Sequence, residues 1–457
     1  MTGPRGLMRN GNFTRFWFGE TVSLFGVRIT ALALPLTAML VLAAGPEELG
    51  LLGFAAYLPY LLVALPFGVL VDRRRKRPLM IGANAVRAVL IGLVPVLAAL
   101  GLLTLPALVA ITLGIGACTV LFEVCWQSYI PVIVGKEHLV AANGRVTASW
   151  SAAESAGPGL GGLLVQLLTA PFALIANAVS YAVSVVSLWS IRAPEPVPEP
   201  SGRHMGKEIL DGLALIVRQP YLRVIMVSGA AYNFFYVFLE ALFVLYAVRV
   251  LGFGPGLIGL VVSLAAIGGV LGAAVAATLV GRLPFGLVFL AAELVSAGGP
   301  LLIPAASGPT VVAAVTVTAG FFVMRVGLAV SNTTSISLRQ TVTPPELLGR
   351  MNASMRALMW GPQTVGALVG GFIGGFAGLR ESMWIASAGL VLSVLPLALS
   401  GIPRIRRLTD VAPAPAPAPA GSRTTAPTGQ PTSAAPPEQF ATPASAGRLA
   451  GVGAGGQ

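Results

Sequence analysis

The chain has 457 residues, of which 55% are hydrophobic and only 10% are charged. A typical soluble domain is roughly 45–50% apolar and about 25% charged. This composition excludes an ordinary soluble enzyme, a disordered protein and a disulfide scaffold, and it indicates a membrane protein with many spans. Membrane topology explains the formal net charge of +12, since cationic loops orient helices, and no nucleic-acid partner is expected.

Apolar runs of about 20 residues, long enough to cross a bilayer, recur along most of the chain. Helices satisfy their own backbone hydrogen bonds in lipid, whereas runs this long do not suit a β-barrel. The pattern therefore predicts an all-α integral membrane fold. We expect twelve transmembrane helices, at 14–43, 49–71, 79–100, 105–130, 147–168, 171–191, 223–248, 256–280, 285–305, 309–332, 357–379 and 382–402.

Lys and Arg alternate between the connections of these spans. If the N-terminus is cytoplasmic, 24 of the 29 Lys and Arg residues lie on that side. The opposite side has only Arg249 and Arg380, and Arg28, Arg87 and Arg325 lie within spans. This positive-inside pattern predicts a multi-pass protein of the cell membrane with both termini in the cytoplasm. The abundance of Ala, Gly, Pro and Arg is typical of a high-GC bacterial genome.

The two halves of the chain repeat at one gap-free offset of 209 positions, as in Pro46 with Pro255 and Gly50 with Gly259. Six spans separate the copies, so both halves face the same way and form two pseudo-symmetric six-helix bundles. The predicted domains are an N-terminal bundle at 1–192, a cytoplasmic connection with a surface helix at 193–222, a C-terminal bundle at 223–403 and a disordered Pro/Ala-rich cytoplasmic tail at 404–457.

The connection between spans 2 and 3 contains GVLVDRRRKR. Together with twelve spans in two parallel halves, it resembles the major facilitator superfamily, whose signature at this loop is G-x-x-x-D-R-x-G-R-R/K. In that family the glycine permits close helix contact, and the acid and arginine tie the bundles together in the outward-facing state. The sequence departs from the pattern at Arg75, and it matches at Gly68, Asp72, Arg73, Lys76 and Arg77.

Span 5 contains GPGLGG, which resembles a motif of exporters in the same superfamily. Small residues let helices approach closely, and Pro158 bends the span. Ordinary glycine packing is the alternative explanation. The motif positions are Gly157, Pro158, Gly161 and Gly162, and the repeat copy has Gly366, Gly370 and Gly371.

Longer strings such as LPYLLVALPFGVLVDR and ISLRQTVTPPELLGRMNASMR narrow the resemblance to one efflux branch. That branch includes drug and macrolide exporters and the enterobactin (siderophore) exporter, and the likeness covers residues 12–402. Many of its members have Asp where this chain has Val27, Asn84 and Asn177. If those acids carry protons in relatives, coupling in this chain uses other residues.

Ionisable residues inside a membrane span are costly and therefore mark functional candidates. Spans 3 and 4 form a short-looped hairpin that predicts a structural ion pair between Arg87 and Glu123, and spans 9 and 10 predict one between Glu293 and Arg325. The remaining charges have no evident local partner. They are Glu20, Arg28, Glu154 and Glu240.

Span 7 carries a stripe of Tyr232, Asn233, Tyr236 and Glu240 at helical spacing. A polar and aromatic stripe with one acid suits a cavity for large amphiphilic or cationic molecules, while packing aromatics would give the same pattern. Spans 1, 4, 7 and 10 line the cavity in the resembled superfamily. The resulting cavity candidates are Arg28, Tyr232, Asn233, Tyr236, Glu240 and Arg325, and the proton-coupling candidates are Glu154, Glu240 and Glu123.

These features predict a secondary active transporter that exports drugs, secondary metabolites or siderophores by alternating access and so contributes to drug resistance. No ATP-binding P-loop is present, which favours proton antiport as the energy source. A proton-coupled importer with the same fold is the alternative. We expect a small-molecule substrate, protons and the lipid bilayer as partners, with a monomer as the functional unit.

Other classes fit the sequence less well. A membrane enzyme is not expected, because the sequence has no nucleophile or metal-ligand constellation, and no metal or cofactor is expected either. A sensor or scaffold would leave the repeat and the intramembrane charges unexplained. A channel would need a selectivity-filter loop, which the sequence lacks.

Overall fold

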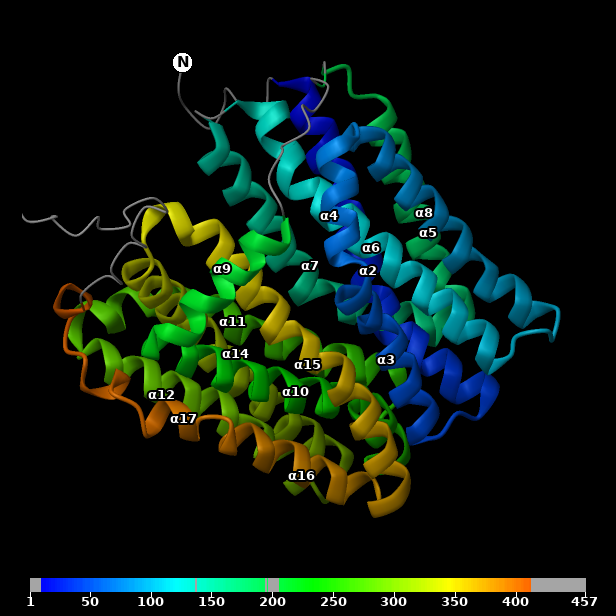
Figure 1. Cartoon of the computed structure of the whole chain (residues 1–457). Helices are drawn as coiled ribbons and strands as arrows, with labels where there is room; N and C mark the ends of the chain where they lie inside the picture. The colour runs from blue at the N-terminus through cyan, green and yellow to red at the C-terminus, as the bar shows by residue number, and fades with distance from the viewer. Residues whose placement is uncertain (1–9, 136–137, 194, 196–204, 412–457) are drawn as a thin grey trace, which may run out of the picture. The chain divides into compact units, whose positions relative to one another are not determined.

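The computed structural model describes residues 10–135, 138–193, 195 and 205–411. Helices make up nearly all of this part of the chain, and it contains no strand. The predicted all-α fold is thus confirmed, and in Figure 1 the helices up to residue 189, blue to blue-green, form one group and the later helices, bright green to orange, another. The predicted disordered tail at 404–457 is wrong for residues 404–411, because Phe285 and Gly286 donate backbone hydrogen bonds to the carbonyl oxygens of Arg406 and Ile405 at 3.0 and 2.9 Å. The rest of the tail, from position 412 onward, lies outside the described residues.

The first bundle and the helix that follows it comprise eight helices. They are α2 (Gly11–Leu42), α3 (Pro46–Leu62), α4 (Ala64–Arg73), α5 (Lys76–Ala99), α6 (Leu105–Val134), α7 (Leu139–Leu168), α8 (Ala170–Trp189) and α9 (Met205–Arg218).

The second bundle repeats this order with several short breaks. It comprises α10 (Pro220–Arg249), α11 (Pro255–Arg282), α12 (Phe285–Gly298), η2 (Gly299–Leu301), α13 (Leu302–Ala305), α14 (Thr310–Val342), η3 (Pro345–Leu347), α15 (Leu348–Ala377), α16 (Leu379–Leu392) and α17 (Leu395–Ala398), followed by the 3₁₀ turns η4 (Ile402–Arg404) and η5 (Leu408–Asp410).

The helices connect alternately at two ends of the bundles. We call the end with the connections 43–45, 100–104, 250–254 and 306–309 the short-loop end, and the opposite end the termini end. Helices α3 and α11 both begin at the short-loop end with Pro at the first helical position. Proline is tolerated there because a backbone N–H at this position has no partner within the helix.

The second span is two helices, α3 and α4, rather than one. Pro66 has no N–H to donate to the carbonyl four residues back, at Leu62, and its ring crowds that carbonyl. The helix therefore breaks at Val63, whose N–H still bonds to the Pro59 carbonyl at 2.9 Å.

Nine helices in the described residues are long and apolar enough to span a membrane by length and composition alone. The other three predicted spans correspond to α3–α4, which is broken, and to α7 and α15, which are more polar.

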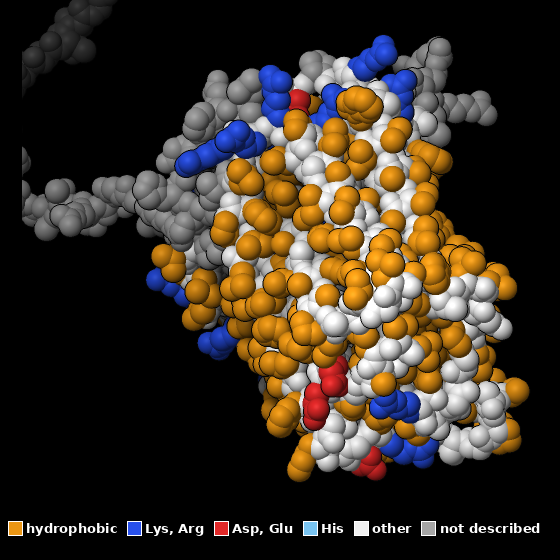
Figure 2. Space-filling model, turned by 90° about the vertical axis from the view of Figure 1, so that its right-hand side faces the viewer, with side chains coloured by type: hydrophobic (Ala, Val, Ile, Leu, Met, Phe, Trp, Pro, Cys, Tyr) orange, Lys and Arg blue, Asp and Glu red, His pale blue; other side chains and the backbone are white. Residues whose placement is uncertain are grey.

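The outer faces of the bundles are apolar. Figure 2 shows a broad area of hydrophobic side chains, with Lys and Arg side chains gathered at its top and again near its bottom. On α5 and α8, exposed side chains include Val89 at 63% and Val186 at 63% of their full area. In water such an area would be costly, and a lipid environment removes that cost.

Backbone contacts between glycines join the two bundles in the half of the spans near the short-loop end. A methyl group added to Gly162 in α7 would lie 3.1 Å from the Cα of Gly259 in α11, and one added to Gly371 in α15 would lie 2.6 Å from the Cα of Gly50 in α3. The offset of 209 positions converts Gly50 into Gly259 and Gly162 into Gly371, so the two contacts are copies of each other. The bundles are closed together at this end.

Helix α9 packs on the second bundle at the termini end. Ile216 is fully buried in a cluster with Met351 and Met355 of α15. Leu210 of the same helix is 64% exposed. The side chain of Ile209 lies outside the described residues.

We predict that Gly259→Leu destabilises the protein, whereas Gly269→Leu in the same helix does not. A side chain at Gly259 would meet the backbone of α7, and nothing lies within 4 Å of a Cβ at Gly269. Overpacking of this kind costs roughly 1–3 kcal/mol. Denaturant titration in detergent micelles measures the free energy of unfolding, and equal effects of the two substitutions would contradict the assigned contact.

Candidate functional site

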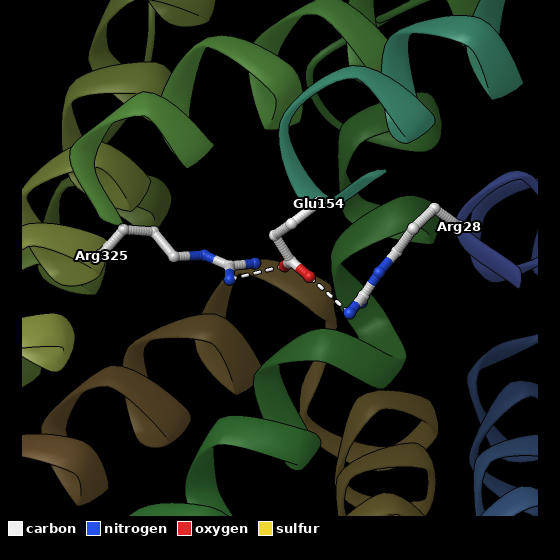
Figure 3. Close-up of polar contacts among 3 residues, drawn as sticks. All are labelled: Arg28, Glu154 and Arg325. Atoms are coloured by element: carbon white, nitrogen blue, oxygen red, sulfur yellow. Dashed lines mark hydrogen bonds and ion pairs between the residues drawn. The ribbon is translucent and has the colours of Figure 1, made fainter. Parts of the chain in front are cut away.

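One carboxylate joins the two bundles in the middle of the spans. Glu154 of α7 accepts a hydrogen bond from Arg325 Nη1 of α14 at 2.6 Å, and its other oxygen pairs with Arg28 Nη2 of α2. Figure 3 shows the carboxylate lying between the two guanidinium groups. Since the Glu154 side chain is only 12% exposed, water screens these contacts weakly.

Glu240 of α10 completes a set of four charges around this position. It lies within electrostatic range of both Arg28 and Arg325, and the Tyr57 hydroxyl of α3 donates to it at 3.4 Å. Two arginines and two glutamates have no net charge together, which lowers the cost of placing them within the membrane span. Four of the candidates from the sequence are thus brought together.

The span-5 glycines place Arg28 beside Glu154. A methyl group added to Gly157 would lie 3.1 Å from Cγ of Arg28, and one added to Gly161 would lie 3.1 Å from Cα of Ile29. These two glycines therefore face α2, while Gly162 faces α11 of the other bundle. Closely packed backbones on both sides of α7 fix the position of the Glu154 side chain.

A second inter-bundle contact lies nearer the termini end. Arg356 of α15 donates to Glu123 of α6 at 3.3 Å, and the Tyr60 hydroxyl of α3 donates to the other Glu123 oxygen at 3.0 Å. The Arg356 guanidinium also lies 4.2 Å from the centroid of the Trp360 ring. Arg356 and Glu123 are 41% and 37% exposed, so this contact is weaker than the bridge at Glu154.

The ion pair predicted between Arg87 and Glu123 was wrong. Arg87 instead donates to Asn84 and to the Tyr181 hydroxyl, both at 2.8 Å, and its guanidinium lies 4.1 Å from the centroid of the Tyr181 ring. A guanidinium with such neutral partners inside the bundle does not need a carboxylate.

The ion pair predicted between Glu293 and Arg325 was also wrong. Arg325 crosses to Glu154, and Glu293 accepts a hydrogen bond from Ser331 of α14 at 2.5 Å. Each predicted pair lies on one hairpin of adjacent spans, but Arg87 and Arg325 bond to helices outside their hairpins, at Tyr181 and Glu154. Glu20 lies within electrostatic range of Arg87 and Glu123, and its buried Oε2 has no hydrogen-bond partner among the described residues.

A cavity of about 490 Å³ lies within the termini-end half of the second bundle. Three of the six predicted cavity residues, Tyr232, Asn233 and Tyr236, line it. The other three, Arg28, Glu240 and Arg325, do not. The rings of Tyr232 and Tyr236 lie nearly parallel, with centroids 6.3 Å apart. The other polar and aromatic lining side chains are Ser228, Glu293, Ser331, Asn332, Ser335, Arg339, Asn352, Arg356, Phe289 and Trp360.

The last two residues of the basic motif after the second span contact the end of α8 and the residues that follow it. The carboxylate of Glu195, beyond α8, accepts the backbone N–H groups of Lys76 and Arg77 at the start of α5. Arg77 also donates to the carbonyl oxygens of Leu188 and Trp189 at the end of α8, at 2.9 and 2.6 Å. Both interactions satisfy free helix termini and fix α5 to α8.

The other motif positions lie on α4 or at its end. Gly68 and Arg73 belong to α4, and Arg73 is exposed. The side chain of Asp72 lies outside the described residues. The predicted link between the bundles through this motif therefore stays a prediction.

Arg339, Arg356 and Trp360 were missed as site residues. Hydropathy placed Arg339 and Arg356 in the connection between spans 10 and 11, but α14 and α15 extend well beyond the apolar windows, to Val342 and back to Leu348. The spacing of four between Arg356 and Trp360 was the available signal, since such residues share a helix face. No group of three or more His, Cys, Asp or Glu side chains in the described chain could hold a metal ion.

The comparison with solved structures supports the same architecture. A bacterial homologue of the human lysosomal transporter Spinster, in an inward-facing and unoccupied conformation, is 14% identical, with 89% of this chain and 98% of that chain covered and a TM-score of 0.66. A bacterial homologue of the iron transporter ferroportin in an inward-facing state is 16% identical, covering 86% and 98% with a TM-score of 0.69. The nucleoside transporter NupG is 12% identical, covering 85% and 98% with a TM-score of 0.68.

At these identities the structural likeness shows the fold alone. A search of curated protein sequences gave no match. The family model described as Major Facilitator Superfamily matches residues 16–361, which is more than half of the chain. The chain therefore belongs to the major facilitator superfamily of membrane transporters, with twelve transmembrane helices in two pseudo-symmetric six-helix bundles.

Proposed function

We propose that this transporter is a proton-coupled antiporter that exports amphiphilic small molecules such as drugs, secondary metabolites or siderophores. The observation that carries the proposal is the bridge from Arg28 through Glu154 to Arg325, because one titratable carboxylate links both bundles at mid-span. The span-5 glycines, which resemble an exporter motif, pack directly beside that carboxylate.

The charge distribution supports a cytoplasmic termini end. Most Lys and Arg residues lie at that end, as the positive-inside rule requires for both termini in the cytoplasm. With this orientation the glycine contacts close the extracellular end, and the cavity lies toward the cytoplasm. The structure is then the state that collects substrate from the cell interior.

Proton binding at Glu154 would loosen the bridge. Protonation removes the negative charge that holds Arg28 and Arg325, so the bundles lose a mid-span link and can rock between the outward-open and inward-open states. A proton bound from the outside in the outward-open state is carried to the inward-open state and released to the cytoplasm, which re-forms the bridge, and bound substrate drives the return to the outward-open state. Glu240, which lies near the same arginines, is the second carboxylate proposed to carry the proton.

We predict that expression in an efflux-deficient bacterial host raises resistance to a subset of a drug and siderophore panel. In inside-out vesicles, an imposed proton gradient should drive the responding compound into the vesicle lumen, and an ionophore that collapses the gradient should stop it. Accumulation by right-side-out cells instead would indicate the importer alternative and contradict the proposed direction.

We predict that Glu154→Gln and Glu240→Gln lose proton-driven efflux while retaining substrate binding. Glutamine keeps the size and hydrogen bonding of the side chain but cannot exchange a proton at neutral pH. Glu346→Gln, at an exposed site on the termini end, serves as the control and should transport normally. Full transport by both test variants would rule out these carboxylates as the coupling groups.

A further inference from the structure

We propose that the cavity in the second bundle binds zwitterionic molecules with a planar aromatic body. This inference rests on the proposed export function, for which it names the substrate class. The cavity has about 490 Å³ and is lined only by residues of the second bundle, so it is a site distinct from the charge bridge at Glu154. Its volume falls within the roughly 300–1,000 Å³ of small-molecule sites.

Two opposite charges in the lining have no ionic partner among the described residues. Arg339 forms no ion pair and its buried Nε has no hydrogen-bond partner. Glu293 accepts only the hydroxyl of Ser331. Ionised groups within a membrane span are stable when they are paired, and here each lacks a counter-ion that a ligand could supply.

The geometry of α14 separates these two charges. Ser331, Ser335 and Arg339 follow one another at intervals of four residues and all line the cavity, so they share one face of the helix. Glu293 is held at the level of Ser331, two turns before Arg339. Eight residues of helix rise correspond to about 12 Å. The cavity thus has a negative and a positive end, separated by a distance that suits a ring system with a charge at each end.

Aromatic side chains line the space between the two ends. The nearly parallel rings of Tyr232 and Tyr236 belong to α10, and Trp360 belongs to α15. The Asn233 side-chain oxygen accepts a hydrogen bond from Gln363 at 2.8 Å, which holds α10 against α15. Flat aromatic surfaces favour a planar ligand.

The first bundle has no equivalent pair of charges. The offset of 209 positions places Asn84 at the position of Glu293 and Ile130 at that of Arg339. Asn84 there is bonded to Arg87, whose guanidinium packs against the rings of Tyr181 and Phe122. The described part of the first bundle therefore has one cation that bonds to Asn84 and Tyr181 at this level, although its Nε has no hydrogen-bond partner, whereas the second bundle has two opposite charges without an ionic partner.

The test compares three xanthene dyes by fluorescence anisotropy with the purified full-length protein in lipid nanodiscs. They are a rhodamine with two free amino groups and a free carboxylate, its methyl ester, which is a cation, and fluorescein, which is an anion. We expect the zwitterion to bind most tightly. A lost charge-assisted contact weakens binding by about tenfold.

The variants should separate the two charges. Arg339→Gln should weaken binding of the zwitterion and of fluorescein about tenfold and leave binding of the ester unchanged. Arg339→Lys should restore part of the lost affinity. Glu293→Gln should weaken the zwitterion and the ester but not fluorescein. Arg282→Gln and Glu346→Gln, both exposed at the termini end, are the matched controls and should not change binding.

Binding without this crossed pattern, or no binding of any dye, would overturn the proposed substrate class. Size-exclusion chromatography of each variant excludes misfolding as the cause. The export proposal is tested separately by its own substrate in vesicles, so proton-driven export with no charge preference in the cavity would refute only the substrate class. The expected pattern of dye binding together with no proton-driven transport in vesicles would refute the export mechanism instead.

Discussion

The carboxylate of Glu154 lies between two guanidinium groups that belong to different bundles, and the arrangement of the mid-span region depends on it. Arg28 shares the first bundle with Glu154, whereas Arg325 comes from the second. Without the carboxylate, these two like charges would have only Glu240 to balance them in a region of low dielectric constant. The bridge therefore stabilises the approach of the bundles in a charge-dependent way, which is what coupling to a proton requires.

Glycine contacts make this bridge possible. Gly162 against Gly259 and its repeat copy, Gly371 against Gly50, bring backbones of opposite bundles together in the half near the short-loop end. In lipid there is no hydrophobic force between helices, so close packing of small residues is a main source of association. The two copies form a symmetric contact, while the charges and the cavity differ between the bundles.

The fold followed from the sequence more completely than the site did. Span length and the internal repeat predicted the all-α fold with two bundles, because lipid imposes helices of fixed minimum length. Partner choice among buried charges was not predictable, since Arg87 and Arg325 reach across to Tyr181 and Glu154 rather than along their hairpins. Arg339 was missed because α14 continues past its apolar window as a helix. Hydropathy identifies the residues that contact lipid. It does not show that the polar end of a helix continues beyond them and lines a cavity.

The proton-dependent bridge is tested most directly by a distance measured across the termini end as a function of pH. Spin labels on Arg74→Cys and Gly349→Cys, with Cys118 and Cys125 replaced by Ala, report the separation of the bundles by double electron–electron resonance. We expect one long distance at neutral pH, a second, shorter one on acidification, and both at every pH in Glu154→Gln. The same pH response with and without Glu154 would contradict its role as the proton-sensitive link.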